Sequence, residues 1–269
     1  MARVPGTLFL KNLVERRGLI FQLVRRDFEQ RFVGSAAGWL WGVIHPLVLL
    51  VSWTFVFSIC MKQTVPPGEG TQSYPIYLFA GMLPWLLFTD TVQRSSSSLL
   101  EHANLITKTV FPAEVVPISV FVSSLISHGL ALALAVAAIA ITENHITPLL
   151  LLLPVYMALI GLFSVGLGWI AAGLQVYLRD TVQMVSVILT FWFWLTPIFI
   201  TEDQVPEALK FLIAGNPLSY IVRAYRQALL TYQPPTLGEF GVVFACAAGT
   251  FIAGGLFFRH MKRGFADVL

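Results

Sequence analysis

Residues 38–61 read GWLWGVIHPLVLLVSWTFVFSICM and contain no Asp, Glu, Lys or Arg. A bilayer core needs about 20 apolar residues in a helix, so this stretch predicts a membrane span at 36–61. Five further stretches are similarly apolar, at 75–92, 115–141, 148–174, 182–200 and 237–258. All are longer than the roughly 10-residue strands of a membrane barrel and lack their in/out alternation. The sequence therefore predicts an all-α integral membrane protein with six transmembrane helices.

The composition agrees with one membrane unit. Hydrophobic residues make up 57% of the 269 residues and charged residues only 12%, about half the charged share of a typical soluble protein. We find no linker or second soluble domain, so we expect a single transmembrane domain over 1–269. Its parts are a cytoplasmic amphipathic helix at 1–35, a six-span bundle at 36–258 and a cytoplasmic tail at 259–269.

The distribution of basic residues predicts the orientation. Thirteen of the 17 Lys and Arg residues lie in the alternate segments that include both chain ends, and four lie in the others. The positive-inside rule therefore places both termini in the cytoplasm. The basic residues flank spans instead of forming one stripe, so the net charge of +3 does not indicate nucleic-acid binding. The first 35 residues contain no apolar core of a leader, so we expect no cleavable signal peptide.

An amphipathic helix is predicted at 7–33, because apolar side chains recur there at three-to-four spacing. These side chains are Leu19, Ile20, Leu23, Val24, Phe28 and Phe32. Arginines on the remaining surface suit anionic lipid headgroups. Two interpretations stay open: a plain membrane anchor, or a collar that also touches a cytoplasmic partner.

Two segments between the spans are candidates for function. Residues 94–109 are polar and compatible with a helix after their serines, so they form either a solvated loop or a short helix that docks into a motor subunit. Residues 201–236 are too long for a simple turn. They place a Gly215-Asn216-Pro217 turn between two short apolar pieces, which predicts a re-entrant helical hairpin; the alternative is an external amphipathic cap.

A search for chemistry finds little. The spans contain few ionisable residues, among them His45 and His128, and no metal-ligand pattern or nucleophile elbow. We therefore expect neither an enzyme nor a metal or cofactor site in this chain, and the scarcity of buried carboxylates disfavours a proton-coupled carrier. The chain also lacks a phosphate-binding G-x-x-x-x-G-K-[ST] loop, so any energy from ATP must come from another subunit.

Aromatic residues are abundant, with 7 Trp, 7 Tyr and 21 Phe. The block Phe191-Trp192-Phe193-Trp194 covers all sides of a helix, so some of its rings must face protein or a lumen. Flat apolar rings suit the C–H faces of sugars and offer a sliding surface. The alternatives are an aromatic belt at the membrane interface and ordinary helix packing.

Four stretches, taken in order, resemble the ABC-2 type permeases, in particular the polysaccharide-export subunits of the Wzm, KpsM and teichoic-acid exporter group. Each motif is short, but their order and spacing from about Gly18 to the C-terminus are specific. They are Arg26-Asp27-Phe28 with Arg31-Phe32, Gly38-Trp39-Leu40-Trp41 and Pro46-Leu47; Gly81-Met82-Leu83-Pro84-Trp85 with Phe88; Tyr177-Leu178-Arg179-Asp180; and Trp194-Leu195-Thr196-Pro197-Ile198 with Asn216-Pro217 and Arg223.

The resemblance implies a half-transporter. Two copies would form a 12-helix pathway with two cytoplasmic ATPase subunits, which would bind the ATP and Mg²⁺. Residues expected to line the channel are Trp41, Trp53, Phe191, Trp192 and Trp194. Residues expected to contact the ATPase from a coupling helix at 94–109 are Glu101, His102, Asn104 and Leu105. Residues of the interface helix near lipid phosphates are Arg25, Arg26, Asp27 and Arg31. Residues of the external gate are Asn216, Pro217, Tyr220 and Arg223.

The cargo that the resemblance implies is a lipid-linked polysaccharide, with O-antigen first, exported across the bacterial inner membrane. Its carrier phosphates would meet the arginines of the interface helix. One alternative is a small-molecule or drug exporter of the same family. Another, from a different class, is a non-transporting membrane scaffold or a glycolipid enzyme, which would have no ATPase partner.

Overall fold

A computed structural model describes residues 17–32, 38–108, 111–144, 146–199 and 205–265. Within these ranges the chain is helical and has no strand, which confirms the all-α class. Five helical segments are long and apolar enough to cross a membrane. They are α3 with η2 (Trp41–Cys60), α4 (Tyr74–Glu101), α6 (Val115–Thr142), η3 with α7 (Pro148–Tyr177) and α11 with η6 (Leu237–Gly264).

The fifth predicted span, at 182–200, is shorter than expected. Helix α8 (Thr181–Leu195) has 15 residues, about 22 Å at 1.5 Å per residue, against a hydrocarbon core of about 30 Å. The helix ends because Thr196 precedes Pro197, and a residue before proline is pushed into extended backbone; Thr196 has φ −93° and ψ 130°. The remaining elements are α2 (Arg17–Phe32), η1 (Gly38–Leu40), α5 (Ala103–Lys108), η5 (Glu207–Leu209), α9 (Lys210–Ala214) and α10 (Pro217–Leu230).

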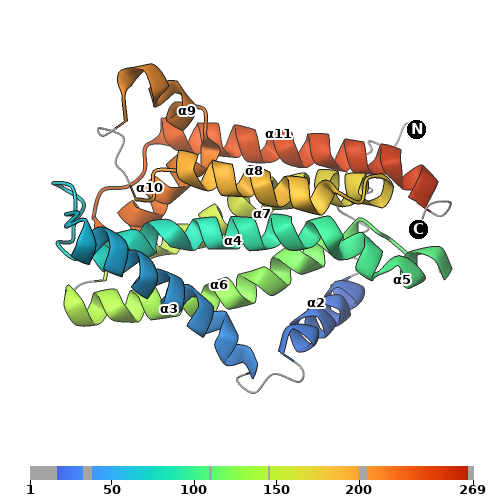
Figure 1. The fold of residues 1–269 in the computed structure, drawn as a ribbon, viewed down its shortest axis with the longest axis horizontal. Helices are drawn as coiled ribbons and strands as arrows, with labels where there is room; N and C mark the ends of the chain where they lie inside the picture. Colours follow the sequence, from blue (N-terminus) through green and yellow to red (C-terminus); the bar gives the residue numbers. More distant parts are fainter. Residues whose placement is uncertain (1–16, 33–37, 109–110, 145, 200–204, 266–269) are drawn as a thin grey trace.

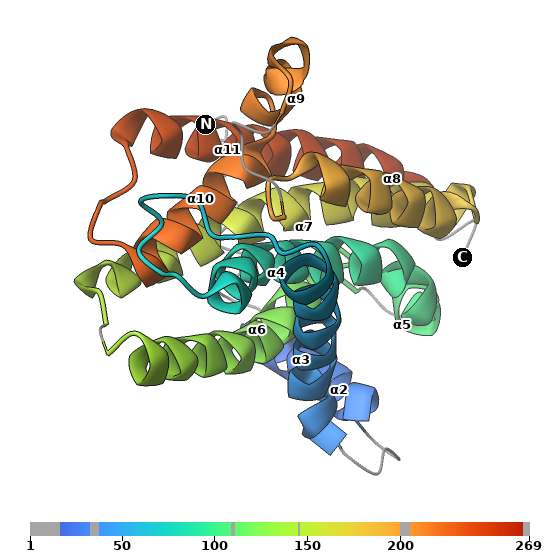
Figure 2. The ribbon, with the colours of Figure 1, turned by 60° about the vertical axis from the view of Figure 1, so that its left-hand side comes forward.

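Helix α4 forms the centre of the bundle and packs against α6, α7, α8 and α10, while α11 lies along α7 (Figure 1). In its most apolar 18-residue window 72% of residues are buried, whereas none is buried in the corresponding window of α3 and η2. Turned by 60°, the structure shows α9 standing out from the bundle on one side and α2 with α3 on the other (Figure 2). The core therefore lies around α4, α7, α10 and α11.

Helix α4 also runs further than the sequence predicts. Its polar end, 93–101, continues the helix, and serine hydroxyls there donate to carbonyls three residues back, as Ser98 does to Ser95 (2.7 Å), so that they can be buried. Ser95 and Ser96 are fully buried, and a Cβ on Gly168 of α7 would lie 2.8 Å from the Ser95 Cβ. Small polar residues let two helices approach closely, so this stretch is a packing surface.

The two ends of the bundle differ. Helix α5, helix α2 and the end of α11 lie at one end, and the 61–73 connection with α9 and the start of α10 lies at the other (Figure 1). At the first end an ion pair joins Lys262 to Glu114 (2.6 Å), which ties the end of α11 to the start of α6. The predicted segment before Arg17 lies outside the described residues.

The first span contains an irregular stretch. Residues Thr54–Cys60 form a π-helix, η2, that continues α3. The amide of Met61 donates to the Val56 carbonyl (2.9 Å), five residues back. The wider turn changes which side chains share a face before and after it.

Candidate functional site

A cluster of stacked aromatic rings joins α3, η2, α4 and α8. Phe193 lies between Trp53 and Trp85, with ring centroids 5.4 Å and 5.3 Å away. Phe199 stacks on Phe57 at 4.4 Å and meets Trp53 edge-on at 5.0 Å. Aromatic pairs at these separations contribute about 0.5–1.5 kcal/mol beyond their buried area. The cluster therefore holds α3 and α8 together near the end of the short helix.

Trp192 belongs to the packing of the bundle. Its ring meets Phe88 edge-on at 5.4 Å and Phe163 at 6.0 Å. Its Nε1 donates to the Asn216 side-chain oxygen (2.9 Å), and the same oxygen accepts from the Leu218 amide (3.1 Å) as the N-cap of α10. The structure thus brings together a predicted channel residue and a predicted gate residue. Trp53 is likewise packed between rings.

Other aromatic candidates remain on the surface of the protomer. Phe191 is 66% exposed and Trp194 is 59% exposed, and Trp41 at the start of α3 is also exposed. Met184, Val187 and Ile188 extend the apolar surface of α8 beside Phe191. Whether these rings line a channel stays a prediction, but they are more exposed than Trp192 and Trp53, which are partly buried.

The predicted hairpin consists of α9 and α10, which meet at the turn Gly215-Asn216-Pro217. The Tyr220 hydroxyl donates to the Ala214 carbonyl (2.8 Å) and closes the turn. Arg223 forms an ion pair with Glu239 of α11 and lies 5.7 Å from the Tyr220 ring centroid. Helix α10 is mostly buried, against α4, α7 and α11, whereas the residues of α9 are mostly exposed.

Arg226 was not predicted, and it is the most buried basic side chain of the hairpin, at 6% exposure. It donates to the carbonyls of Pro197 (3.0 Å) and Ile198 (2.7 Å) and lies 3.7 Å from the Tyr77 ring centroid. These carbonyls follow the end of α8, where the helix supplies no partner. Gly81 leaves the space, since a Cβ there would lie 2.6 Å from Nη2. The sequence offers one signal for this role: Arg226 interrupts the otherwise apolar face of α10.

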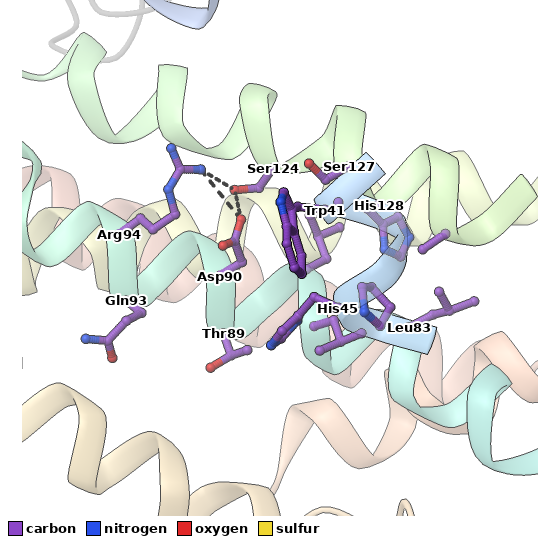
Figure 3. A pocket seen from close by; sticks show the side chains of 15 residues that line it. Trp41, His45, Leu83, Thr89, Asp90, Gln93, Arg94, Ser124, Ser127 and His128 are labelled. Carbon is purple, nitrogen blue, oxygen red and sulfur yellow. Dashed lines mark hydrogen bonds and ion pairs between the residues drawn. The ribbon is translucent and has the colours of Figure 1, made fainter. Parts of the chain in front are cut away.

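A cavity of about 500 Å³ lies between α3, α4 and α6 (Figure 3). Its floor is apolar and includes Leu83, Leu86 and Pro46, and Trp41 with His45 forms one wall, one helical turn apart on α3. Asp90 and Arg94 point from α4 toward Ser124 of α6, while Thr89 and Gln93 leave α4 on another side (Figure 3). The cavity therefore combines an aromatic wall, an apolar floor and a polar end.

The charged groups at the polar end bind one another. Ser124 donates to Asp90 Oδ2 (2.6 Å), and Arg94 Nη1 lies 3.3 Å from the Ser124 hydroxyl and 3.6 Å from Asp90 Oδ2. Arg94 Nη2 forms an ion pair with Asp27 of α2. All three charged side chains are partly buried, where water screens a pair less than at the surface. Arg94 therefore fixes α2 against α4 and α6.

The four predicted residues of the interface helix separate in the structure. Asp27 faces Arg94, whereas Arg25 is exposed and pairs with Glu29 (2.7 Å). The hydrogen bond to Glu29 and the charge of that carboxylate raise the pKa of the Arg25 guanidinium. Arg26 is exposed, and the side chain of Arg31 lies outside the described residues. Leu23 and Val24 are buried where α2 packs against α6, in agreement with the predicted apolar face.

The predicted coupling segment is divided between two helices. Residues 94–101 belong to α4, which continues nine residues past the predicted end of the second span at 92; the buried serines described above explain the difference. Glu101 accepts from Ser97 (2.7 Å), and His102 ends α4 with its Nδ1 2.8 Å from the Ser98 carbonyl. Asn104 and Leu105 lie on the six-residue α5, so all four residues remain neighbours at one end of the bundle.

Comparison with known proteins matches residues 18–230 to the model of the ABC-2 type transporter family. The O-antigen export system permease protein RfbA of Myxococcus xanthus is 28% identical over 260 residues, covering 96% of this chain and 98% of the relative. A protein of the same description from Klebsiella pneumoniae is 27% identical, covering 93% and 95%. The polysialic acid transport protein KpsM of Escherichia coli is 21% identical, covering 77% and 80%.

The family match spans well over half of the sequence, including α2, the first span, the central helix α4 and the hairpin of α9 and α10. It agrees with an all-helical chain that contains five helices able to cross a membrane. The protein is therefore a multi-pass membrane protein, and it belongs to the ABC-2 type transporter family.

Proposed function

We propose that this chain is the membrane subunit of an ABC exporter that moves a lipid-linked, O-antigen-like polysaccharide from the cytoplasm across the bacterial inner membrane. The observation that carries this proposal is the end-to-end similarity to permeases named for O-antigen export, which covers 96% of this chain. The relatives named for another polysaccharide cover less of it, 77%. The cargo class therefore rests on whole-chain similarity, since family membership alone spans many cargoes.

The channel would form between two copies of the chain. Helices α3 and α8 each expose a row of large apolar side chains that no other part of the protomer covers. Large exposed apolar patches mark contacts with lipid or with another protein. In this arrangement the exposed rings of Trp41, Phe191 and Trp194 would face the glycan. Trp53 and Trp192 would pack within the protomer and hold α3 and α8 in position. The short α8 would be completed at its external end by α10, entering the membrane from outside as a re-entrant helix.

Energy would come from two cytoplasmic ATPase subunits that bind ATP and Mg²⁺. The end of α4 with α5 offers Glu101, His102, Asn104 and Leu105 as contacts at the same end of the bundle as α2. ATP-driven movement of α5 would then reach α4 directly, because the two helices are joined at His102. With this end in the cytoplasm, the hairpin lies on the outer side of the membrane.

The carrier phosphates would bind at the exposed surface of α2. Arg25 and Arg26 are accessible there, and Arg31 lies one to two turns further along. Charge-assisted hydrogen bonds from guanidinium groups suit phosphate oxygens. Asp27 does not contribute, because it pairs with Arg94.

The test is deletion of the gene in its host, followed by localisation of the lipid-linked glycan. We expect glycan to accumulate on the cytoplasmic face and to disappear from the cell surface, with recovery when the gene is restored. Complementation with Trp194→Ala, at matched expression, should restore export only in part. Normal surface glycan in the deletion strain would remove this cargo and favour a small-molecule exporter of the same family.

A further inference from the structure

The cavity between α3, α4 and α6 has a charge balance that disfavours phosphate. Its single guanidinium, Arg94, lies against two carboxylates, Asp27 and Asp90. The three side chains together carry one net negative charge. A phosphate group entering here would meet carboxylates that already compete for the same guanidinium, and like charges in a partly buried site repel strongly. The charged end of the cavity therefore holds α2 against α4 and repels anions.

The hydrogen-bonding groups left over in the cavity include no carboxylate, guanidinium or ammonium group. Trp41 and His45 lie on α3, and Thr89 and Gln93 lie on α4, each pair one helical turn apart. Among the described residues none of these four side chains has a hydrogen-bond partner. Together they offer an indole N–H, an imidazole, a hydroxyl and a carboxamide, which can both donate and accept. Such a set suits a ligand that carries several hydroxyl groups and no charge.

The rest of the lining fits the same ligand. The Trp41 ring provides a flat apolar wall for the C–H face of a sugar ring, and Leu83, Leu86 and Pro46 provide an apolar floor. The volume of about 500 Å³ lies within the range of about 300–1,000 Å³ found for small-ligand sites. A few placed polar groups on a mostly apolar lining is the usual composition of such sites.

We infer that this cavity binds a neutral sugar of the transported glycan, close to its lipid anchor, and excludes the carrier phosphates. The inference rests on the proposed function. It assigns the two parts of one substrate to two places: phosphates to Arg25 and Arg26 on the outer surface of α2, and the adjoining sugar to the cavity on the other side of the Asp27–Arg94 ion pair. Thr89 and Gln93 then read the sugar by hydrogen bonds, and Trp41 stacks on it.

Cysteine protection tests this site in the native transporter complex. The two free cysteines, Cys60 and Cys246, are replaced by alanine, and Thr89→Cys is introduced in that background. The complex is purified from host membranes into lipid nanodiscs and labelled with a maleimide. Three probes are added separately: the oligosaccharide released from the host's own lipid-linked glycan, maltotriose, and inorganic pyrophosphate. Thr64→Cys, on the exposed 61–73 connection at the far end of the bundle, is the matched control.

The host oligosaccharide should slow labelling of Thr89→Cys about tenfold once its concentration reaches about ten times its dissociation constant. Pyrophosphate should leave the rate unchanged, and no probe should affect Thr64→Cys. Adding Gln93→Ala, which leaves Asp27, Asp90 and Arg94 in place, should weaken protection about two- to tenfold, the effect of one lost hydrogen bond. The melting temperature of each variant verifies that it is folded.

Three results would overturn the inference. Protection by pyrophosphate makes the cavity an anion site. Equal protection by maltotriose makes it a general sugar site unrelated to the cargo. Lack of protection by the host oligosaccharide in a folded complex leaves the cavity without this ligand. Failure of the proposed function is read separately, from the surface glycan of the deletion strain.

Discussion

The first and second spans are both strongly apolar, yet they occupy opposite environments. Every residue of the apolar window of α3 and η2 is at least partly accessible, whereas 72% of the window of α4 is buried. The buried span α4 is the less apolar of the two, because lipid is at least as apolar as a protein interior and a buried span can hold polar residues that pack against protein. The difference lies in small and polar residues: α4 carries Gly81, Ser95 and Ser96 where neighbours approach closely. A lipid-facing or partner-facing span needs no such positions.

The largest expected effect on the packed region comes from Arg226, which joins α10 to α4 and to the end of α8. In Arg226→Met two buried carbonyls lose their donor, at about 1–3 kcal/mol each, and the desolvated cation–π contact with Tyr77 is lost, at about 2 kcal/mol. Relief of the cost of burying the charge offsets part of this. We expect the free energy of unfolding in mixed micelles to fall by about 4 kcal/mol.

Arg223→Met is the matched control on the same helix. Its ion pair with Glu239 is partly exposed, and such pairs contribute about 0–1 kcal/mol. A similar loss of stability in both variants would show that Arg226 has no special structural role at the end of α8.

Two phenylalanines test the contrast between the spans directly. Phe88 on α4 is fully buried and stacks on Phe163 with ring centroids 5.5 Å apart, whereas Phe55 on η2 is 56% exposed. Phe88→Ala leaves a cavity and loses these contacts, so the free energy of unfolding should fall by about 3 kcal/mol, the lower end of the range for Phe→Ala in cores. Phe55→Ala should change it by less than about 0.5 kcal/mol.

The readout for this pair is thermal unfolding of the purified protein, followed by size-exclusion chromatography. A large fall in the free energy of unfolding of the Phe55 variant would mean that η2 is covered in the assembled protein. The difference in burial between the first and second spans would then be smaller than one protomer shows. In that case the loss should depend on protein concentration, because a second copy supplies the cover.

The smallest of the three effects concerns two glycines on opposite faces of α11. A Cβ on Gly254 would collide with the backbone carbonyl of Gly166 on α7, whereas one on Gly249 would meet nothing within 4 Å. Gly254→Ala forces two backbones apart and should cost about 2 kcal/mol. Gly249→Ala should be neutral or stabilising by up to about 1 kcal/mol, because alanine is the better helix former. Equal melting temperatures would contradict the close crossing of α7 and α11.

Sequence patterns predicted the long elements well. Long apolar runs located five of the helices, and the Gly-Asn-Pro turn located the hairpin of α9 and α10. The errors have physical causes. The polar stretch after Arg94 predicts a segment outside the second span, but its serine hydroxyls bond to the backbone of the same helix, so α4 continues through it and packs there. Helix α8 was predicted too long, because the apolar run continues past Pro197 although the helix cannot.

The candidate site was predicted less well. Aromatic composition identified α3 and α8, but it could not separate Trp192, which packs inside the bundle, from Trp194, which is exposed. That distinction depends on the side of the helix that meets Phe88 and Asn216. The ion-pair cluster of Asp27, Arg94 and Asp90 could not be predicted either, because Asp27 and Arg94 lie 67 positions apart in sequence. Arg223 was selected by resemblance, whereas Arg226 makes the buried contacts.

The π-helix at Thr54–Cys60 has a consequence for how this family can vary. A π-turn holds an extra residue that an α-helix would lack, so the chain can gain or lose one residue there while both ends of the span stay in place. Helix α4 is a continuous α-helix and has no π-turn that could absorb an inserted residue. An insertion there would rotate everything beyond it by about 100° and turn Arg94 away from Ser124. Length differences between related permeases should therefore be tolerated in the first span and eliminated by selection in the second.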